Sequence, residues 1–459
     1  MKPSIPQGTR DFAPQTVRER QYILNTIKQV YELYGYQPLE TPAMENLATL
    51  TGKYGDEGDK LMFKVLNNGL NNPAKQEKIQ TAFQNVLQGK SSIDITERAL
   101  RYDLTIPFAR FVAMNAHEIA LPFKRYQMQP VWRADRPQKG RYREFWQCDA
   151  DVVGSNSLLN EAELLAIYRT VFHLLAIPKI EVKINNRKIL AGLAEAINAD
   201  ELFMDMTVAI DKLDKIHWDG VKKELEERGF NEDQIKTIHQ FISIEKSSIE
   251  EMLEQVASII GHSQTAQKGI EEIKEVIRYH HILVQPEWQN ELVLDFTLAR
   301  GLNYYTGTIV EVKTSAIEMG SIGGGGRYDD LTGLFGLKGI SGVGISFGVD
   351  RIYDVIKQLD LFPTDTIQTI DVLLMNIDAS TTEQMIQLMV TLRNNGVKCE
   401  VYSDVSKMDK QMKYANKRNV PFVAFMGSQE LEQGKVALKN MVTGTQDLLD
   451  ESKFLQAFV

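Results

Sequence analysis

The stretch from Lys124 to Gly154 constrains the fold and the chemistry of this chain more than any other segment. It reads KRYQMQPVWRADRPQKGRYREFWQCDADVVG, with an apolar, strand-like run at each end and a loop between them. Basic side chains gather in and before the loop, whereas the second run carries Asp149 and Asp151. Arginine binds phosphate oxygens two at a time through its planar guanidinium group. The stretch therefore predicts a hairpin that binds a polyphosphate beside an amine. Its arginines are Arg125, Arg133, Arg136, Arg141 and Arg143.

The composition of the 459 residues is that of an ordinary folded protein, with 43% hydrophobic and 25% charged residues. This length has room for two or three domains. No apolar run reaches the roughly 18 residues of a membrane span, and the N-terminal MKPSIPQGTRDF lacks the apolar core of an export signal. A net charge of −9 argues against a general nucleic-acid binder but leaves local basic patches open.

Cysteine and histidine usage predicts no metal site. The two cysteines, Cys148 and Cys399, are far apart and match no metal-ligand spacing, so we expect a reduced, cytoplasmic setting. The seven histidines are scattered, and the adjacent His280 and His281 lack the helical spacing of a zinc site.

Strand-like and helical stretches in residues 1–365 predict an α+β domain built on an antiparallel sheet. The polar segment 67–92 suggests a surface excursion with one helix near Gln76–Leu87. Ser157 is a candidate N-cap for a helix over Leu158–Leu175. The pattern also predicts a helix at Val17–Tyr34 and strands at Ala99–Leu104, Phe123–Trp132, Glu144–Val153, Glu291–Leu298, Gly307–Val312, Gly320–Gly326 and Gly342–Gly348.

Two changes in residue composition and pattern along the chain predict further structural units. Residues 186–288 are rich in Glu, Lys and Ile at helical spacing and poor in glycine, which indicates a helical insertion. After a linker near Phe362, residues 366–459 alternate strands with helices, which indicates an α/β domain around a mostly parallel sheet. Within it, Ser380 and Glu383 have the spacing of a helix capping box.

Two more segments carry chemistry. Arg300 interrupts an apolar strand end in LARGLNYYTG, where an arginine is either buried with a partner or directed into a cleft. The glycines Gly323–Gly326 predict either a bend or a close approach of another group to the backbone. Gly348 marks the junction of a strand and a helix, which puts Arg351 in the first helical turn.

Taken with these segments, the chain resembles the histidyl-tRNA synthetase family of class II aminoacyl-tRNA synthetases over essentially its whole length. Three motifs are typical of the class: the helix ending at Gly35 with its strand to Pro42, the hairpin Phe123–Val153, and Gly342–Arg351. More specific to the family are LRYDLT at 100–105, RPQKGRYR at 136–143 and RGLNYY at 300–305; residues 413–423 and 430–436 are similar to its anticodon-binding domain.

The resemblance implies a class II catalytic domain at 1–365 containing the helical insertion 186–288, and an anticodon-binding domain at 366–459. It implies that ATP activates histidine as an adenylate and that histidine then passes to the 3′ end of tRNA(His). Arg133 and Arg300 would act on the α-phosphate as catalytic residues, and Arg141 and Arg351 would bind the outer phosphates. Mg²⁺ would bridge phosphate oxygens, with no protein ligand assigned.

The resemblance also implies an amino-acid pocket. Asp103, Thr105 and Gln147 match positions that bind the ammonium group, and Asp151 and Tyr305 match positions that bind the imidazole ring; Tyr304 and Tyr328 lie alongside. Many bacterial members have Glu where this chain has Asp103 and Asp151, and Asn303 replaces a common Asp. These departures shorten the reach of two acids and put one supporting contact in doubt.

For tRNA, the resemblance places Arg136 and Gln138 in a loop facing the acceptor end. Four lysines spaced by three, three and four residues would lie on one face of a helix, which predicts a surface that binds tRNA phosphates. A plain solvated helix face is nearly as good an interpretation. They are Lys407, Lys410, Lys413 and Lys417. Class membership further implies a homodimer.

Two alternatives remain open. A histidine-binding regulatory paralogue of ATP phosphoribosyltransferase would resemble the catalytic domain, but such proteins generally lack the C-terminal domain and lose motif arginines. A class II enzyme for another amino acid is disfavoured by the segment 300–305 and by Asp151. Taken singly, the hairpin could be a solvated, salt-bridged loop. Asp103 or Asp151, taken alone, could be an ordinary turn or ion-pair residue.

Overall fold

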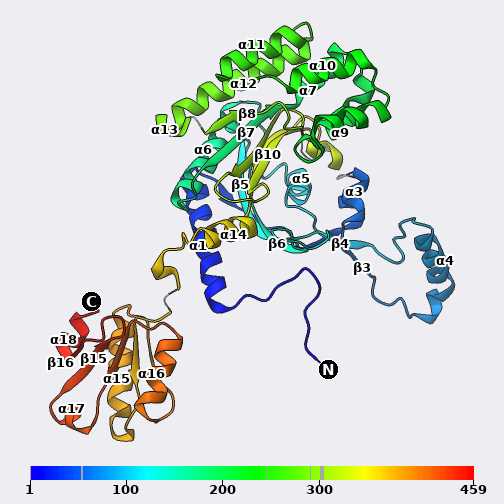
Figure 1. Cartoon of the computed structure of the whole chain (residues 1–459). Helices are drawn as coiled ribbons and strands as arrows, with labels where there is room; N and C mark the ends of the chain where they lie inside the picture. Colours follow the sequence, from blue (N-terminus) through cyan, green and yellow to red (C-terminus); the bar gives the residue numbers. More distant parts are fainter. Residues whose placement is uncertain are drawn as a thin grey trace. The chain divides into compact units, whose positions relative to one another are not determined.

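The computed structural model describes residues 2–52, 55–245, 247–289, 291–299, 304–367 and 369–458. The chain forms two compact units, and the first ends at Leu361 where the second begins at Phe362. The sequence suggested a division at 365/366. Arg300 and Asn303 lie outside the described residues. Figure 1 shows both units.

The first unit is built on an eight-stranded sheet with the order β1-β5-β6-β11-β10-β9-β7-β8. All neighbouring strands run antiparallel except β1 with β5 and β7 with β8. The prediction of an antiparallel-rich α+β domain is therefore confirmed. The strands are β1 (Gln37–Pro38), β5 (Phe123–Trp132), β6 (Glu144–Val153), β7 (Ile180–Asn186), β8 (Leu292–Leu294), β9 (Thr308–Thr314), β10 (Gly323–Asp329) and β11 (Ser341–Gly348).

The register of the central strands fixes which side chains can meet. Asp151 on β6 lies opposite Arg125 on β5 and Gly344 on β11. Because strand side chains alternate between the two faces, Gln147 and Asp149 lie on the same face as Asp151. The intervening Cys148, Ala150 and Val152 are fully buried on the other face.

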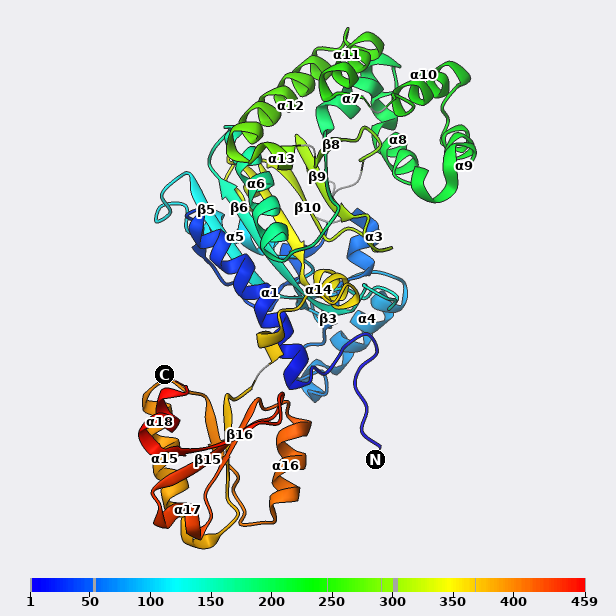
Figure 2. The same ribbon diagram turned by 60° about the vertical axis from the view of Figure 1, so that its left-hand side comes forward.

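That other face packs on helices α1 (Pro14–Leu33) and α6 (Leu159–Leu174), which lie side by side in Figure 2. Phe347 of β11 is fully buried between them, with its ring 4.7 Å from Tyr168 and 5.4 Å from Phe172. Two tyrosines tie these helices to the strands. Tyr31 donates to the Cys148 carbonyl at 2.7 Å, and Tyr168 donates to the carbonyl of Gly324 on β10 at 2.9 Å. Helix α14 (Val349–Gln358) packs beside α1.

The glycines of β10 and β11 are required by this packing. A Cβ on Gly323 would lie 2.6 Å from the Tyr168 ring, and one on Gly342 would lie 2.3 Å from the Tyr328 ring. The predicted close approach is thus made by aromatic rings and neighbouring backbone of the chain itself.

The strand predicted at Glu291–Leu298 is only β8 (Leu292–Leu294), and another strand prediction was wrong in both its place and its length. The pattern at Ala99–Leu104 gives only β4 (Arg98–Leu100), which pairs with β2 (Met44–Asn46) and β3 (Lys64–Val65) in a separate sheet. The strand cannot continue because Asp103 accepts from the Ile106 N–H at 3.2 Å, at the start of α5 (Thr105–Met114).

The excursion at 67–92 holds α4 (Gln76–Leu87), as predicted, on an arm away from the main sheet in Figure 1. Ile79 and Ala82 are its buried residues, whereas Leu87 is 77% exposed. Two short helices precede it, α2 (Leu47–Leu50) and α3 (Gly55–Lys60).

Residues after β7 form a helical layer at one end of the sheet (Figure 1). Its two central helices pack closely: a Cβ on Gly192 of α7 would lie 2.4 Å from Ala266 of α12. The chain then returns to the sheet as β8. The helices are α7 (Arg187–Ala196), α8 (Phe203–Ile210), α9 (Leu213–Glu227), α10 (Glu232–Ile242), α11 (Ile249–Ile260), α12 (Gln264–Leu283) and α13 (Pro286–Gln289).

The second unit holds a five-stranded sheet, ordered β13-β12-β14-β15-β16, with helices packed on it. Only β12 with β13 and β12 with β14 are parallel, so the sheet is mixed rather than mostly parallel. The strands are β12 (Val372–Met375), β13 (Cys399–Val401), β14 (Phe422–Phe425), β15 (Lys435–Asn440) and β16 (Gln446–Asp450); the helices are α15 (Thr382–Asn394), α16 (Met408–Lys417), α17 (Ser428–Glu432) and α18 (Glu451–Gln456).

Two predicted caps were also wrong. The Ser380 N–H is itself capped by Asp378 at 2.9 Å, and this short turn delays the start of α15 to Thr382. Ser157 accepts from the Leu159 N–H at 3.3 Å, one residue ahead of the actual N-cap, Leu158. Among the described residues, none of the helices is both long and apolar enough to cross a membrane.

Replacing Phe347 with alanine should lower the free energy of unfolding of the first unit by roughly 3–5 kcal/mol, because a fully buried ring leaves a cavity. Phe83→Ala is the matched control, since that ring is 40% exposed on α4 and its loss should cost about 0.5 kcal/mol or less. Urea unfolding followed by circular dichroism measures both. Equal midpoint shifts would contradict this account of the core.

Candidate functional site

The face of the main sheet opposite α1 and α6 carries a continuous hollow. Arg133 and Gln147 line three adjoining pockets there, which makes one site of them. We call the first part the inner pocket; it is lined by Asp103, Thr105, Gln147, Asp149, Asp151, Tyr304, Tyr305, Gly324, Tyr328 and Ser346. The other two together form the outer pocket, lined by Asp135, Gly140, Arg141, Tyr142, Phe145, Glu311, Ser321, Gly348 and Arg351.

The inner pocket brings together all seven residues that the sequence suggested for an amino-acid site. They come from four separate parts of the chain: the start of α5, strand β6, the segment before β9, and strand β10. Three rings form one wall, with the Tyr304 ring 5.0 Å from Tyr305 and 6.1 Å from Tyr328. Two of these rings reach the acids of the pocket through their hydroxyls, Tyr328 at Asp151 and Tyr304 at Asp103.

Asp151 is held in one orientation by two partners. Arg125, fully buried, places Nη2 2.8 Å from Oδ2 of Asp151, and the Tyr328 hydroxyl donates to Oδ1 at 2.6 Å. Gly344 leaves the space for this carboxylate, because a Cβ there would lie 2.0 Å from Oδ1. Burial raises the pKa of Asp151, while the Arg125 charge and the Tyr328 hydroxyl oppose that rise.

Asp103 lies at the N-terminus of α5, where its charge meets the positive end of the helix. It is 2% exposed, and its Oδ1 accepts from the Ile106 N–H at 3.2 Å. The Tyr304 hydroxyl lies 3.5 Å from its Oδ2. Thr105 is the first residue of the same helix, so this helix start positions two of the expected side chains together.

The sequence singled out Arg125 and Asp149 only as parts of the hairpin, without a place in the amino-acid pocket, and it did not point to Ser346 at all. Burial raises the pKa of Asp149 to about 7, with the Asp151 charge adding to the rise and Arg125 and the Ser346 hydroxyl opposing it. The register of the hairpin strands is the signal that could have placed Arg125 beside Asp151. Pairing Phe123 with Val153 puts Arg125 directly across from Asp151.

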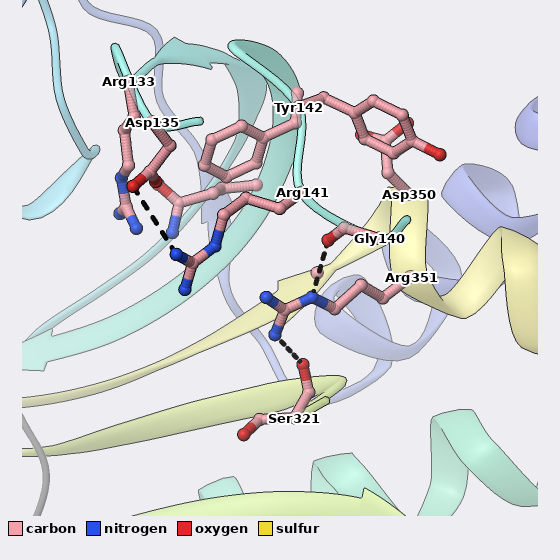
Figure 3. Close-up of a pocket in the computed structure, with 11 residues that line it drawn as sticks. Arg133, Asp135, Gly140, Arg141, Tyr142, Ser321, Asp350 and Arg351 are labelled. Atoms are coloured by element: carbon pink, nitrogen blue, oxygen red, sulfur yellow. Dashed lines mark hydrogen bonds and ion pairs between the residues drawn. The ribbon is translucent and has the colours of Figure 1, made fainter. Parts of the chain in front are cut away.

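The outer pocket is lined by arginines, and Figure 3 shows their side chains reaching into it. Arg133 donates from Nε to the Tyr102 carbonyl at 3.1 Å, and its guanidinium lies 4.3 Å from the centre of the Tyr102 ring. Arg351 donates from Nε to the Gly140 carbonyl at 2.8 Å and from Nη1 to the Ser321 carbonyl at 2.7 Å. These contacts hold both guanidinium groups in place.

Arg141 is held less tightly than the other two arginines. Its Nη1 lies 3.6 Å from Oδ1 of Asp135, and its side chain is 47% exposed.

A buried carboxylate braces this pocket from behind. Asp350, 4% exposed, forms ion pairs with Arg10 and Arg20 and accepts from the Trp146 N–H at 3.1 Å. Arg10 also lies 3.3 Å from the centre of the Tyr142 ring. The N-terminal segment thus joins β6 to the start of α14, which carries Arg351.

The remaining predicted residues lie elsewhere. Arg136 and Gln138 are exposed in the loop between β5 and β6, where Gln138 and Arg141 exchange backbone hydrogen bonds of 3.1 and 2.9 Å. Lys410 and Lys413 are exposed on α16 of the second unit, and the Lys410 ammonium lies 5.8 Å from the centre of the Tyr402 ring. Arg300 lies outside the described residues.

The arrangement suits one kind of chemistry. Carboxylates and hydroxyls of the inner pocket can hold a cationic amino group and a second polar group, whereas three guanidinium groups of the outer pocket can hold phosphates. Arg133 borders both pockets, so groups bound in each would meet beside it.

Comparison with known proteins gives the same picture. Residues 84–352 match the family model described as histidyl-tRNA synthetase, and residues 370–459 match the one described as an anticodon binding domain. A histidine–tRNA ligase of Phocaeicola vulgatus is 50% identical over 99% of this chain and 98% of its own length. One of Christiangramia forsetii is 51% identical over 98% of this chain and 97% of its own.

Solved structures agree. The histidyl-tRNA synthetase of Nostoc sp. PCC 7120 superposes with a TM-score of 0.83 at 30% identity, over 100% of this chain and 99% of its own. A Bacillus halodurans protein described as an ATP phosphoribosyltransferase regulatory subunit/histidyl-tRNA synthetase shares only the fold, with a TM-score of 0.70 and 17% identity over 90% of this chain and 97% of its own. The regulatory alternative is therefore the less supported one. The chain belongs to the histidyl-tRNA synthetase family, whose members are ATP-dependent ligases that join histidine to tRNA.

Proposed function

We propose that the chain activates L-histidine with ATP to histidyl-adenylate and pyrophosphate, and then transfers histidine to the 3′ end of tRNA(His). The observation that carries this proposal is the junction at Arg133 of an acidic inner pocket and an arginine-lined outer pocket. The first step brings a carboxylate to a phosphorus atom, and the second brings a ribose hydroxyl to the adenylate.

In the inner pocket, Asp103, Thr105 and Gln147 bind the α-ammonium group of histidine. Asp151 and Tyr305 bind the imidazole ring, with Tyr304 and Tyr328 alongside. The orientation of Asp151 supports this assignment, because Arg125 and Tyr328 hold it rigid before any ligand arrives. A buried polar site of this kind rejects side chains that leave its groups unpaired.

In the outer pocket, Arg133 and Arg300 stabilise the charge that develops at the α-phosphate, while Arg141 and Arg351 bind the outer phosphates. Transfer at phosphorus needs in-line positioning and fixed positive charge more than covalent help. The backbone contacts of Arg133 and Arg351 support such roles, because a guanidinium held in place costs no reorganisation during the reaction.

Mg²⁺ would supply further charge neutralisation on the phosphates. Within the described part of the chain, no group of three or more His, Cys, Asp or Glu could hold a metal. Three carboxylates line the outer pocket, Glu311, Asp135 and Asp350, and Asp350 is already paired with Arg10 and Arg20. This sparse set fits an ion held mainly by phosphate oxygens and waters with one carboxylate, the mode that Mg²⁺ favours. We propose Glu311 for that contact.

For tRNA, we propose that Arg136 and Gln138 contact the acceptor end and that Lys410 and Lys413 contact phosphates of the anticodon arm. The second unit, which matches an anticodon binding domain, supports the latter role. The exposed position of all four side chains is compatible with such contacts. We further propose a homodimer, which the class II motif ending at Pro42 supports. We also propose a cytoplasmic location, which the two free, buried cysteines support.

Arg133→Ala and Arg300→Ala should each reduce kcat of histidine-dependent pyrophosphate exchange by roughly 10²–10³, the effect of losing one donor aimed at developing charge. Lys139→Ala, in the same loop as Arg141 but exposed, is the control and should remain near wild type. Wild-type rates in the Arg300 variant would remove that residue from the mechanism.

Tyr305→Phe should raise KM for histidine roughly tenfold and leave KM for ATP unchanged, because the ring nitrogen loses its partner in a buried site. Tyr142→Phe is the matched control, because Tyr142 lines the outer pocket rather than the inner one. Its hydroxyl lies 3.4 Å from Oδ2 of Asp354. Its KM for histidine should stay at the wild-type value. Pyrophosphate exchange at varied histidine measures both. Identical KM values in the two variants would argue against the proposed ring contact.

Arg136→Ala should leave pyrophosphate exchange intact and lower kcat/KM for tRNA in the aminoacylation assay by roughly tenfold, the value of one charged hydrogen bond. Lys90→Ala removes an equally exposed cation from the 67–92 excursion and should change neither rate. A loss of pyrophosphate exchange in the Arg136 variant would place this arginine in the first step instead.

A further inference from the structure

Tyr304 and Tyr305 line the inner pocket from a stretch of chain that lies outside the main sheet. Regular pairing of β9 with β10 ends where Ile309 meets Gly326, and β9 itself begins only at Thr308. A stretch outside a sheet lacks the ladder of hydrogen bonds that fixes a strand. Other contacts must therefore decide where the two tyrosine rings lie.

Thr306, which follows Tyr305, is bonded to β10 through both its backbone and its side chain. Its N–H donates to the Arg327 carbonyl at 2.8 Å. Its hydroxyl oxygen accepts from the Asp329 N–H at 3.0 Å and donates to Oδ2 of the same aspartate at 2.7 Å. The Arg327 carbonyl is a more distant acceptor at 3.4 Å, and a hydroxyl has only one proton to donate. We call Thr306 and Asp329 the clamp.

Buried residues anchor the aspartate of the clamp, although Asp329 itself is exposed. The Ser341 hydroxyl on β11 donates to Oδ1 of Asp329 at 2.6 Å. Arg327 donates from Nη1 to the Ser341 oxygen at 2.6 Å and from Nη2 to Oε2 of Glu161 on α6 at 2.7 Å. Ser341, Arg327 and Glu161 are all buried. Both carboxylate oxygens of Asp329 are thus engaged, and its side chain is tied to α6 behind the sheet.

The clamp controls the position of the two tyrosine rings. Tyr305 is joined directly to Thr306, and its ring lies so close to β10 that a Cβ on Gly326 would be 2.9 Å from it. The Tyr304 ring lies 5.0 Å from the Tyr305 ring, and its hydroxyl lies 3.5 Å from Oδ2 of Asp103. The two clamp residues themselves line neither the inner nor the outer pocket, so they act through the tyrosines.

We propose that Thr306 and Asp329 are positioning residues that hold Tyr304 and Tyr305 in the arrangement that binds histidine. The inference rests on the proposed function, since it takes histidine to occupy the inner pocket. A wall that is already in place spares the ligand the cost of ordering it, which tightens binding. ATP should be unaffected, because backbone carbonyls away from the clamp hold Arg133 and Arg351.

The first test removes the hydroxyl of the clamp. Thr306→Val keeps the shape of the side chain, and Kd for L-histidine, measured by titration calorimetry, should rise about tenfold, the equivalent of one charge-assisted hydrogen bond. Thr306→Ser keeps the hydroxyl and should retain the wild-type affinity. Equal losses of affinity in the valine and serine variants would overturn the proposal, because the hydroxyl would then have no part in binding.

The second test removes the other half of the clamp. Asp329→Ala should weaken histidine binding by about the same factor as Thr306→Val. The double variant should be no weaker than either single variant, because both substitutions remove the same interaction. A double variant in which the two losses multiply would overturn the clamp, since it would show that the residues act independently.

Pyrophosphate exchange separates positioning from a general loss of structure. KM for histidine should rise about tenfold in Thr306→Val and in Asp329→Ala. KM for ATP and the midpoint of urea unfolding should stay at their wild-type values in both. A parallel rise of the two KM values, or an unchanged KM for histidine, would overturn the positioning role.

Thr81→Val is the matched control, because it removes an exposed hydroxyl on α4 that donates to the Glu77 carbonyl at 3.1 Å. Its Kd and KM for histidine should equal those of wild type, and a rise in either would overturn the assignment of the effect to the clamp. Absence of histidine-dependent exchange in the wild type would instead overturn the proposed reaction itself.

Discussion

The buried ion pair between Arg125 and Asp151 is the interaction on which the site depends. It joins the neighbouring strands β5 and β6 of the main sheet at 2.8 Å, with Arg125 fully buried. Two charges out of water are tolerated only when each is compensated, so the pair fixes the strand register and the direction of the carboxylate together. Gly344 on β11 is part of the same requirement, because any side chain there would occupy the space of Asp151.

From that pair the sheet face divides into regions of opposite charge. Toward one end, acids and tyrosines line the inner pocket; toward the loop, arginines line the outer pocket. Backbone carbonyls hold Arg133 and Arg351, and a carboxylate anchored by two N-terminal arginines supports the helix that carries Arg351. Secondary structure thus keeps the acidic and the basic side chains in separate regions, which adjoin at Arg133.

Local pattern was sufficient for much of the fold. The hairpin strands Phe123–Trp132 and Glu144–Val153 and the helix Gln76–Leu87 have the predicted bounds, because alternation and helical periodicity are local properties. Pattern failed where a longer-range or competing contact decided the outcome. Asp103 ended a strand by capping a helix, and Asp378 displaced the expected cap at Ser380. The parallel character of the last sheet was overestimated because alternation does not reveal that β15 pairs antiparallel with β14 and β16 antiparallel with β15.

The sequence by itself determined the element types, the two-part organisation and the residue classes of the site, since arginine-rich and glycine-rich motifs carry their chemistry in their side chains and backbone freedom. Only the tertiary structure decided which acids share a pocket and which of them is compensated. Asp149 and Asp151 look equivalent along the chain, yet Asp151 forms an ion pair with Arg125, whereas the Asp149 carboxylate is hydrogen-bonded by the Ser346 hydroxyl. The physical reason is that the cost of a charge depends on its burial and its neighbours, and both come from strands far apart in sequence.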